Sequence, residues 1–309
     1  MIEVANLRKQ FGSLLAVDNI SFKARPGEVL GFLGPNGAGK SSTMRMISGF
    51  LVPTSGTASI YGHDIANAPI AAKKSLGYLP EGAPLYGEMN TEEFLRFIAR
   101  VRGMDKTTQV GRINITLERL SLKSVAHQSI ETLSKGFKRR VGLAAAILHE
   151  PSALILDEPT DGLDPNQKHE VRALIRELSK ERTVLLSTHI LEEVEALCSR
   201  VIIIAHGKIL ADATPAELLA KSRYDRAISI HVTDSISARA ALDGMPGVTG
   251  FEQNAVDGRL YVFTKTKVRA DEAIAERLRM RQVAFTDMRI ERGRLDEVFR
   301  SITMPGAKS

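Results

Sequence analysis

The chain has 309 residues, of which 43% are hydrophobic and 25% charged, and its formal net charge is +6. These values predict a globular protein of about two domains and argue against a long disordered segment. No apolar run approaches the ~18 residues of a membrane span, no signal peptide is evident, and the single cysteine, Cys198, excludes an internal disulfide. We therefore expect a cytosolic protein. Its one run of three basic residues, Lys138-Arg139-Arg140, is too small to predict a nucleic-acid surface.

Residues 1–33 contain short apolar runs separated by turn signals at Phe11-Gly12 and Pro26-Gly27. The ring of Phe11 stands between a glutamine and a glycine. Its position alone leaves two interpretations open, a core aromatic or a ring that stacks on a purine. The apolar run at residues 29–33 predicts a buried strand.

A glycine-rich segment follows this strand and fits the pattern G-x-x-x-x-G-K-[ST] of a phosphate-binding loop. It consists of Gly34, Pro35, Asn36, Gly37, Ala38, Gly39, Lys40, Ser41 and Ser42. Residues 42–50 show helical spacing, so strand, loop and helix occur in the order that the motif requires. Backbone N–H groups and the helix N-terminus can bind phosphate oxygens there. Lys40 can reach the β- and γ-phosphates, and the Ser41 hydroxyl can ligate Mg²⁺.

Residues 85–150 are predicted to form a mostly helical insertion between two strand-rich parts. Asn90 and Glu93 have the spacing of a capping box, and apolar residues follow at helical spacing up to Val101. Near the end of the insertion, a polar loop at residues 133–137 begins another helix.

Two apolar runs further along the chain end in reactive side chains. Residues 153–156 predict a buried strand followed by Asp157 and Glu158, and a strand at residues 184–188 ends at His189. A carboxylate pair directly after four apolar residues favours Asp157 as a Mg²⁺ ligand, through water, and Glu158 as the general base for water. Alternating strands and helices predict a parallel, doubly wound sheet whose strand ends carry the loop, the carboxylates and His189.

Residues 222–309 begin a new pattern. Strands and helices are predicted in the order β-α-β-β-α-β of a ferredoxin-like domain, followed by a closing amphipathic helix. This part shows no catalytic cluster, and its single histidine, His231, is expected to be structural. We expect an accessory domain that serves in dimer contact or regulation.

Taken together, the motifs over residues 1–220 resemble the nucleotide-binding subunit of an ABC transporter. Leu133-Ser134-Lys135-Gly136-Phe137 resembles the family signature L-S-G-G-Q and precedes Asp157-Glu158 at the family's spacing. Gly162-Leu163-Asp164 resembles the loop after the catalytic carboxylate, and His189 falls at the family's switch histidine. The resemblance implies an α/β P-loop NTPase with a RecA-like core, an antiparallel β part and a helical subdomain at residues 85–150. The ferredoxin-like domain would occupy residues 221–309.

The resemblance also implies a mechanism. Two copies would close head to tail around two ATP molecules, each with Mg²⁺, and Ser134 and Gly136 of one copy would cap the γ-phosphate held by the other. Phe11 matches the position that stacks on adenine, and His189 would hydrogen-bond the γ-phosphate. The implied partner is an integral-membrane permease on a separate chain, with no nucleic acid. The subunit would then sit in the cytoplasm, peripherally on the inner face of the cell membrane.

Two motifs depart from the family pattern. The signature has Lys135 where glycine is usual and Phe137 where glutamine is usual, and the lid-switch position holds Glu81 in place of glutamine. A carboxylate at position 81 could still bind Mg²⁺ or water, but an amide donor is lost. These variants, together with the small C-terminal domain, resemble a bacterial exporter branch that includes gliding-motility-type ATPases.

Two other functions compete with the ATPase subunit of a transporter. A soluble ABC ATPase that acts on ribosomes or nucleic acid usually carries two cassettes or a long coiled-coil insertion. The sequence of this chain contains one cassette and neither of these features. A regulatory module without hydrolysis is disfavoured because Lys40, Glu158 and His189 are all present.

Overall fold

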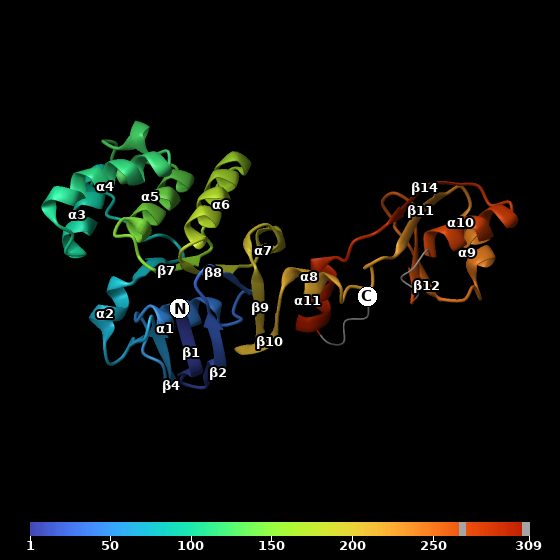
Figure 1. The fold of residues 1–309 in the computed structure, drawn as a ribbon, viewed down its shortest axis with the longest axis horizontal. Coiled ribbons are helices and arrows are strands. Elements are labelled where there is room, and N and C mark those ends of the chain that lie inside the picture. The colour runs from blue at the N-terminus through green and yellow to red at the C-terminus, as the bar shows by residue number, and fades with distance from the viewer. Residues whose placement is uncertain (266–269, 305–309) are drawn as a thin grey trace. The chain divides into compact units, whose positions relative to one another are not determined.

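The computed structural model describes residues 1–265 and 270–304. The chain divides into two compact units, Met1–Pro215 and Ala216–Ser309 (Figure 1). The division lies a few residues before the change of pattern in the sequence, because the short helix α8 (Pro215–Leu219) belongs almost wholly to the second unit. Within the second unit, Gly293 packs so closely on Leu219 of α8 that an added Cβ would lie 2.0 Å from the Leu219 carbonyl oxygen.

The core of the first unit is a six-stranded sheet of order β10-β9-β3-β8-β7-β6. Neighbouring strands run parallel, except that β10 is antiparallel to β9. The strands are β3 (Val29–Leu33), β6 (Leu76–Leu79), β7 (Ala153–Asp157), β8 (Thr183–Thr188), β9 (Arg200–Ala205) and β10 (Lys208–Ala213). Every residue of β3, β7 and β8 is buried, which explains their continuous apolar sequences. The predicted parallel α/β core is confirmed.

Four helices of the first unit connect or flank the strands of this sheet. They are α1 (Lys40–Ile47), α2 (Pro69–Lys74), α6 (Pro165–Ser179) and α7 (Leu191–Leu197). Cys198 lies one residue beyond α7 in an extended conformation. Its thiol is buried against Gly31, where an added Cβ would lie 2.5 Å from the sulfur, and burial raises the pKa of Cys198 to about 12.

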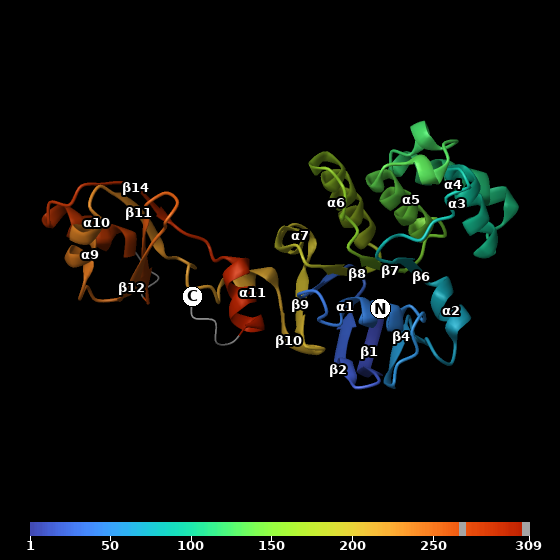
Figure 2. The same cartoon turned by 180° about the vertical axis from the view of Figure 1, so that it is seen from behind.

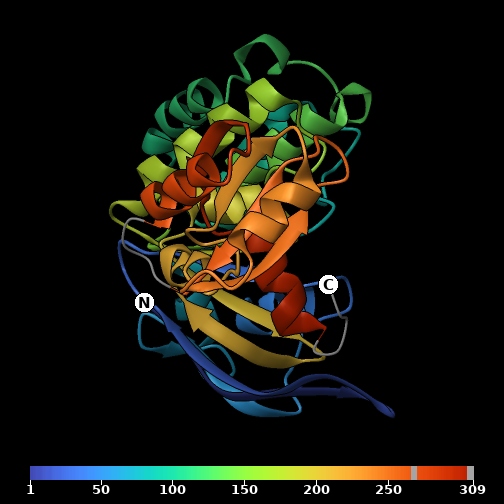
Figure 3. The same cartoon turned by 90° about the vertical axis from the view of Figure 1, so that its right-hand side faces the viewer.

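A second, antiparallel sheet of order β2-β1-β4-β5 accompanies this core (Figure 3). Its strands are β1 (Ile2–Phe11), β2 (Leu14–Ala24), β4 (Ser55–Ile60) and β5 (His63–Asp64). Apolar side chains of this sheet and of β3 form one buried cluster with α1, which fixes the loop between β3 and α1 against both sheets.

The helical part comprises α3 (Thr91–Val101), α4 (Lys106–Arg119) and α5 (Lys135–Ile147), with two short 3₁₀ turns at Lys123–Val125 and Ile130–Thr132. The three helices gather beside β6 and β7, away from β1, β2 and β4 (Figure 2). The predicted capping box is present, because Asn90 Oδ1 accepts from Glu93 N at 2.9 Å and Glu93 Oε2 accepts from Asn90 N at 3.0 Å.

The second unit contains β11 (Ile228–Val232), α9 (Ser235–Leu242), β12 (Val248–Gln253), β13 (Leu260–Thr264), α10 (Ala270–Met280), β14 (Phe285–Ile290) and α11 (Leu295–Thr303). The strands form an antiparallel sheet of order β12-β13-β11-β14. One face packs on α9 and α10 through residues such as Ile230, Val262 and Leu278. This order of elements and strands confirms the ferredoxin-like domain.

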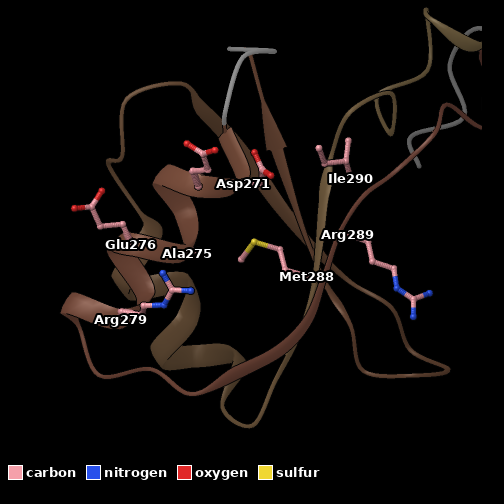
Figure 4. A pocket seen from close by; sticks show the side chains of 8 residues that line it. Asp271, Ala275, Glu276, Arg279, Met288, Arg289 and Ile290 are labelled. Carbon is pink, nitrogen blue, oxygen red and sulfur yellow. The ribbon is translucent and has the colours of Figure 1, made fainter.

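An open groove of about 560 Å³ lies between α10 and β14, where Met288 points from the strand toward the helix (Figure 4). Its lining carries both acidic and basic side chains, among them Asp271, Glu276 and Arg279. Within the described ranges, no group of three or more His, Cys, Asp or Glu side chains could hold a metal ion. The same residues include no helix that is long and apolar enough to cross a membrane.

Candidate active site

A cavity of about 430 Å³ in the first unit brings most of the predicted site residues together. Its lining residues are Phe11, Leu14, Ala16, Asn36, Gly37, Gly39, Lys40, Ser41, Ser42, Glu81, Glu158 and His189. They come from β1, β2, the β3–α1 loop, the first turn of α1 and the segments that follow β6, β7 and β8. Because parallel strands end at the same edge of a sheet, residues far apart in the sequence meet there.

The loop between β3 and α1 requires glycine for steric reasons. A Cβ on Gly34 would lie 2.3 Å from the carbonyl oxygen of Ile204, and a Cβ on Gly39 would lie 2.5 Å from that of Ala16. Gly39 also has φ +102°, a left-handed conformation that other residues rarely adopt. The loop therefore packs against β9 and β2 at distances that no side chain permits.

The ammonium group of Lys40 is held within this loop. Its Nζ donates to the carbonyl oxygens of Gly34 at 2.7 Å and Pro35 at 3.0 Å, and the residue is only 6% exposed. Burial lowers the pKa of Lys40, while the nearby Glu158 and Asp157 raise it and so offset part of the change. A buried cation that is bound only to neutral carbonyls can exchange them for the oxygens of an anion.

Two carboxylates follow one another at the end of β7. Asp157 is 1% exposed, and within the described chain neither of its carboxylate oxygens has a hydrogen-bond partner. Glu158 lies at the cavity, and its Oε1 is 2.7 Å from His189 Nδ1. Buried carboxylate oxygens normally accept hydrogen bonds. The two oxygens of Asp157 that lack a partner are therefore suited to bind a cation or a water molecule.

The loop that carries His189 is held by a buried acid that the sequence gives no reason to single out. Thr188 Oγ1 accepts from Ile190 N at 3.0 Å and donates to Glu193 Oε2 at 2.6 Å. Glu193 is 1% exposed, and burial raises its pKa. In the sequence it is one of three acids on a short helix, so only its packing distinguishes it from its exposed neighbours Glu192 and Glu195.

The open side of the cavity is apolar and aromatic. Phe11 ends β1, is 45% exposed and pairs in register with Leu14 of β2. Lys9 Nζ lies 5.0 Å from the centre of the Phe11 ring. The sequence analysis did not identify Leu14 and Ala16 as site residues, because their place in the cavity depends on the pairing of β1 with β2.

The remaining predicted residues divide into two groups. Gly34, Pro35 and Ala38 belong to the same β3–α1 loop, and Asp157 adjoins Glu158 in the chain. Ser134 and Gly136 do not line the cavity. They lie at the N-terminus of α5, where Ser134 Oγ accepts from Phe137 N at 3.3 Å and Gly136 packs on Gln167. The single chain therefore does not complete the predicted set.

Comparisons with known proteins identify the family of this chain. A family model described as "ABC transporter" matches residues 17–161. The probable multidrug ABC transporter ATP-binding protein YbhF of Escherichia coli is 41% identical over 73% of this chain, which spans only 39% of that relative. The linearmycin resistance ATP-binding protein LnrL of Bacillus subtilis is 36% identical over 75% of both chains. A solved ATP binding subunit of an ABC transporter has a TM-score of 0.67 and 32% identity, covering 72% of this chain and 92% of its own.

Proposed function

This chain belongs to the family of ABC transporter ATP-binding proteins, and we propose that it is an ATPase that powers export through a separate membrane permease. The observation that carries the proposal is one cavity holding the Lys40 loop, the Glu158–His189 pair and, beside them, the unpartnered carboxylate of Asp157. Those groups can bind the phosphates, position a water and accept its proton.

We assign the hydrolysis step to Glu158. It accepts a proton from water as the water oxygen attacks the γ-phosphorus, and the bond from that phosphorus to the bridging oxygen of ADP breaks. Lys40 and the N–H groups of the loop stabilise the charge on the phosphate oxygens. His189 holds Glu158 through the 2.7 Å contact and would hydrogen-bond the γ-phosphate, while Phe11 offers its exposed ring to the adenine.

The donor set also fits Mg²⁺, which prefers oxygen ligands and retains several waters. The Ser41 hydroxyl lines the cavity, and Asp157 presents two buried oxygens without partners. Glu81 adds a further carboxylate at the cavity. When bound, the ion neutralises charge on the β- and γ-phosphates. In this chain Ser41 and Asp157 would hold it, with Glu81 as an added oxygen ligand.

The location of Ser134 and Gly136 outside the cavity supports a dimer. Both lie at the N-terminus of α5, which carries partial positive charge and free N–H groups. Such a helix end would bind the phosphate oxygens of an ATP molecule that is held by a second copy. We propose that two copies close head to tail, so that each supplies these residues to the other's ATP.

An apolar groove in the first unit supports a permease partner. It has a volume of about 440 Å³ and is lined by residues of α2, β6, α3 and the segment that follows α1, including Phe50, Ile70 and Val101. Those three side chains are 74%, 74% and 67% exposed. Exposed apolar side chains that gather in a groove mark a protein interface. A cytoplasmic segment of the permease would hold the chain peripherally on the inner face of the membrane.

The direction of transport and the choice of partner rest on the relatives. The names of YbhF and LnrL describe multidrug transport and linearmycin resistance, which favours export. Neither name mentions ribosomes or nucleic acid, so the soluble-ATPase alternative is not favoured.

The test of this function is Glu158→Gln in the purified chain. The change removes the base and its charge while keeping the size of the side chain, so ATP hydrolysis should fall roughly 10²–10⁴-fold. ATP binding should survive or tighten, and gel filtration with ATP and Mg²⁺ should show a dimer in the variant and mainly monomer in the parent. Asp157→Asn serves as the matched control, since it should weaken nucleotide binding in Mg²⁺ as well. Hydrolysis by Glu158→Gln at the parental rate would overturn both the base and the ATP-sandwich dimer.

A further inference from the structure

One buried arginine touches the catalytic segment and the lid loop (residues 80–85) at the same time. Arg139 lies on α5 and is 6% exposed. Its Nη2 donates to the carbonyl oxygens of both Asp157 and Glu158, and its Nη1 donates to that of Pro80 at 2.9 Å. A single guanidinium group therefore joins α5, the end of β7 and the first residue of the loop that carries Glu81.

The backbone that Arg139 holds is strained. Glu158 has φ +52°, a left-handed conformation that is uncommon outside glycine. Such conformations persist when surrounding contacts enforce them, and they concentrate at functional sites. Here the Glu158 carbonyl is bound by Arg139, its N–H donates to Ser187 O at 2.9 Å, and its carboxylate contacts His189. The contacts on both sides of its Cα direct the Glu158 side chain into the cavity.

Packing gives α5 a second connection to the lid loop. A Cβ on Gly142 would lie 2.8 Å from Ala83 Cβ and 2.9 Å from Leu79 Cδ1, so the helix lies directly against this loop and the end of β6. Arg139 and Gly142 thus contact the lid loop through hydrogen bonding and packing respectively. Displacement of α5 would move the lid loop with it.

We propose that Arg139 is a positioning residue for ATP hydrolysis: by binding the carbonyls of residues 80, 157 and 158 it sets Glu158 and Glu81 in one cavity and links both to α5. The proposal rests on the assignment of Glu158 as the general base. Because Ser134 and Gly136 lie at the N-terminus of α5, closure of a second copy on that helix end would reach the base of the same chain through Arg139.

The chemistry of the side chain explains why arginine suits this place. Its planar fork of five N–H donors serves several carbonyls at fixed angles, whereas a lysine ammonium is a point charge on a flexible stem. Arg140 provides a natural comparison on the same helix. It is 5% exposed, but its contacts are the Leu120 carbonyl at 3.2 Å, Glu170 at 3.7 Å and the Phe137 ring. None of those groups lines the cavity.

The experiment compares Arg139→Met, Arg139→Lys and Arg140→Met in the full chain. For Arg139→Met we expect kcat to fall about 10–100-fold, the cost of a displaced catalytic group. Its KM for ATP and its binding of a fluorescent methylanthraniloyl-ATP should stay within about threefold of the parent, because the phosphate loop is untouched. Arg139→Lys should recover part of kcat, and Arg140→Met should retain kcat within about threefold.

Thermal unfolding of all three variants separates positioning from general loss of structure. If Arg139→Met does not fold, Arg139→Lys tests the proposal instead, and we expect it to lower kcat while KM for ATP stays near the parental value. Parental kcat in the folded Arg139 variants, or an equal fall in Arg140→Met, would overturn the proposal. Glu158→Gln is measured alongside: if it is inactive while the Arg139 variants are fully active, only the positioning role fails. Parental activity of Glu158→Gln would instead remove the base assignment itself.

Discussion

The two compact units contain clusters of polar side chains that differ in how they are satisfied. In the first unit, Asp157 keeps two buried oxygens without partners, and Lys40 binds only carbonyls of its own loop. In the second unit, Glu252 accepts from Arg223 Nη2 and from the Tyr224 hydroxyl, both at 2.6 Å. Arg294 lies 3.8 Å from the centre of the Tyr224 ring and completes this cluster.

The difference indicates which unit performs chemistry. Unpaired buried polar groups destabilise a fold unless a ligand satisfies them, so they mark a place where a ligand binds. A cluster whose charges satisfy one another stabilises its own surroundings and has no free group to offer a substrate. We therefore place the proposed ATP chemistry in the first unit, and we still expect the second to serve in dimer contact or regulation.

Removing the charge of the phosphate loop should have the largest effect. We expect Lys40→Ala to lower ATP turnover by at least about 10²-fold and to weaken nucleotide binding sharply, because a cation that stabilises the transferred phosphoryl group is lost. The matched control is Lys221→Ala, an exposed lysine of the second unit that should leave turnover unchanged. Steady-state hydrolysis and equilibrium binding measure both. Near-normal turnover in Lys40→Ala would remove the assignment of the site.

The apolar groove that contains Phe50, Ile70 and Val101 allows a comparison of exposed apolar residues in the two units. Ile70 in the groove and Ile236 on α9 are 74% and 79% exposed. We expect Ile70→Asp to reduce co-purification with the permease about 10-fold, since a charge in an apolar interface must be desolvated, and to leave hydrolysis by the isolated chain unchanged. Ile236→Asp should affect neither. Equal recovery of the permease with both variants would place its binding surface elsewhere.

The sequence predicts those parts of the site that depend on local order. Strand, glycine loop and helix around Lys40, the carboxylates after β7 and the capping box at Asn90 each occupy a few consecutive residues. Their physical signals are glycine conformation, apolar runs and cap spacing. Each of these signals can therefore be recognised within a short stretch of sequence. The order of elements in the second unit could be predicted for the same reason.

Residues that act through contacts distant in sequence could not be predicted. Arg139 lies in a basic triplet, where a solvated face is the ordinary interpretation, yet it binds carbonyls at positions 80, 157 and 158. Glu193 resembles its exposed neighbours, and Leu14 and Ala16 enter the cavity through strand pairing. Ser134 and Gly136 show the opposite case, because motif spacing singles them out although the single chain leaves them outside the cavity.

Removing all but the first seven residues of the second unit should have a smaller effect on hydrolysis. A chain that ends at Ser222 keeps every residue of the cavity, so we expect its basal turnover to stay within about threefold of the full chain. Circular dichroism and ATP binding establish that the shortened chain is folded. If it folds and binds ATP but does not hydrolyse it, the second unit contributes to catalysis and the division of roles is wrong.

The smallest expected effect is on stability, and its test compares the half-buried His149 of the first unit with the exposed His231 of the second. Burial, with Arg102 and Arg182 nearby, lowers the pKa of His149 to about 4, and its Nε2 lies 3.0 Å from the Leu76 carbonyl oxygen. In the unfolded chain a histidine titrates near about 6.5. The folded state therefore binds fewer protons between these values, and stability is full above pH ~6.5 and lost as the pH falls toward 4.

We expect the parent to lose on the order of 1–2 kcal/mol of unfolding free energy from this residue between pH 7 and pH 5. His149→Gln keeps an amide donor for Leu76 but cannot gain a proton, so the variant should lose correspondingly less over the same range. His231→Gln, at an exposed position on β11, should follow the parent. Urea unfolding of the three chains at both pH values measures the difference. If the two glutamine variants respond alike to acid, the His149 imidazole is not what makes the first unit sensitive to pH.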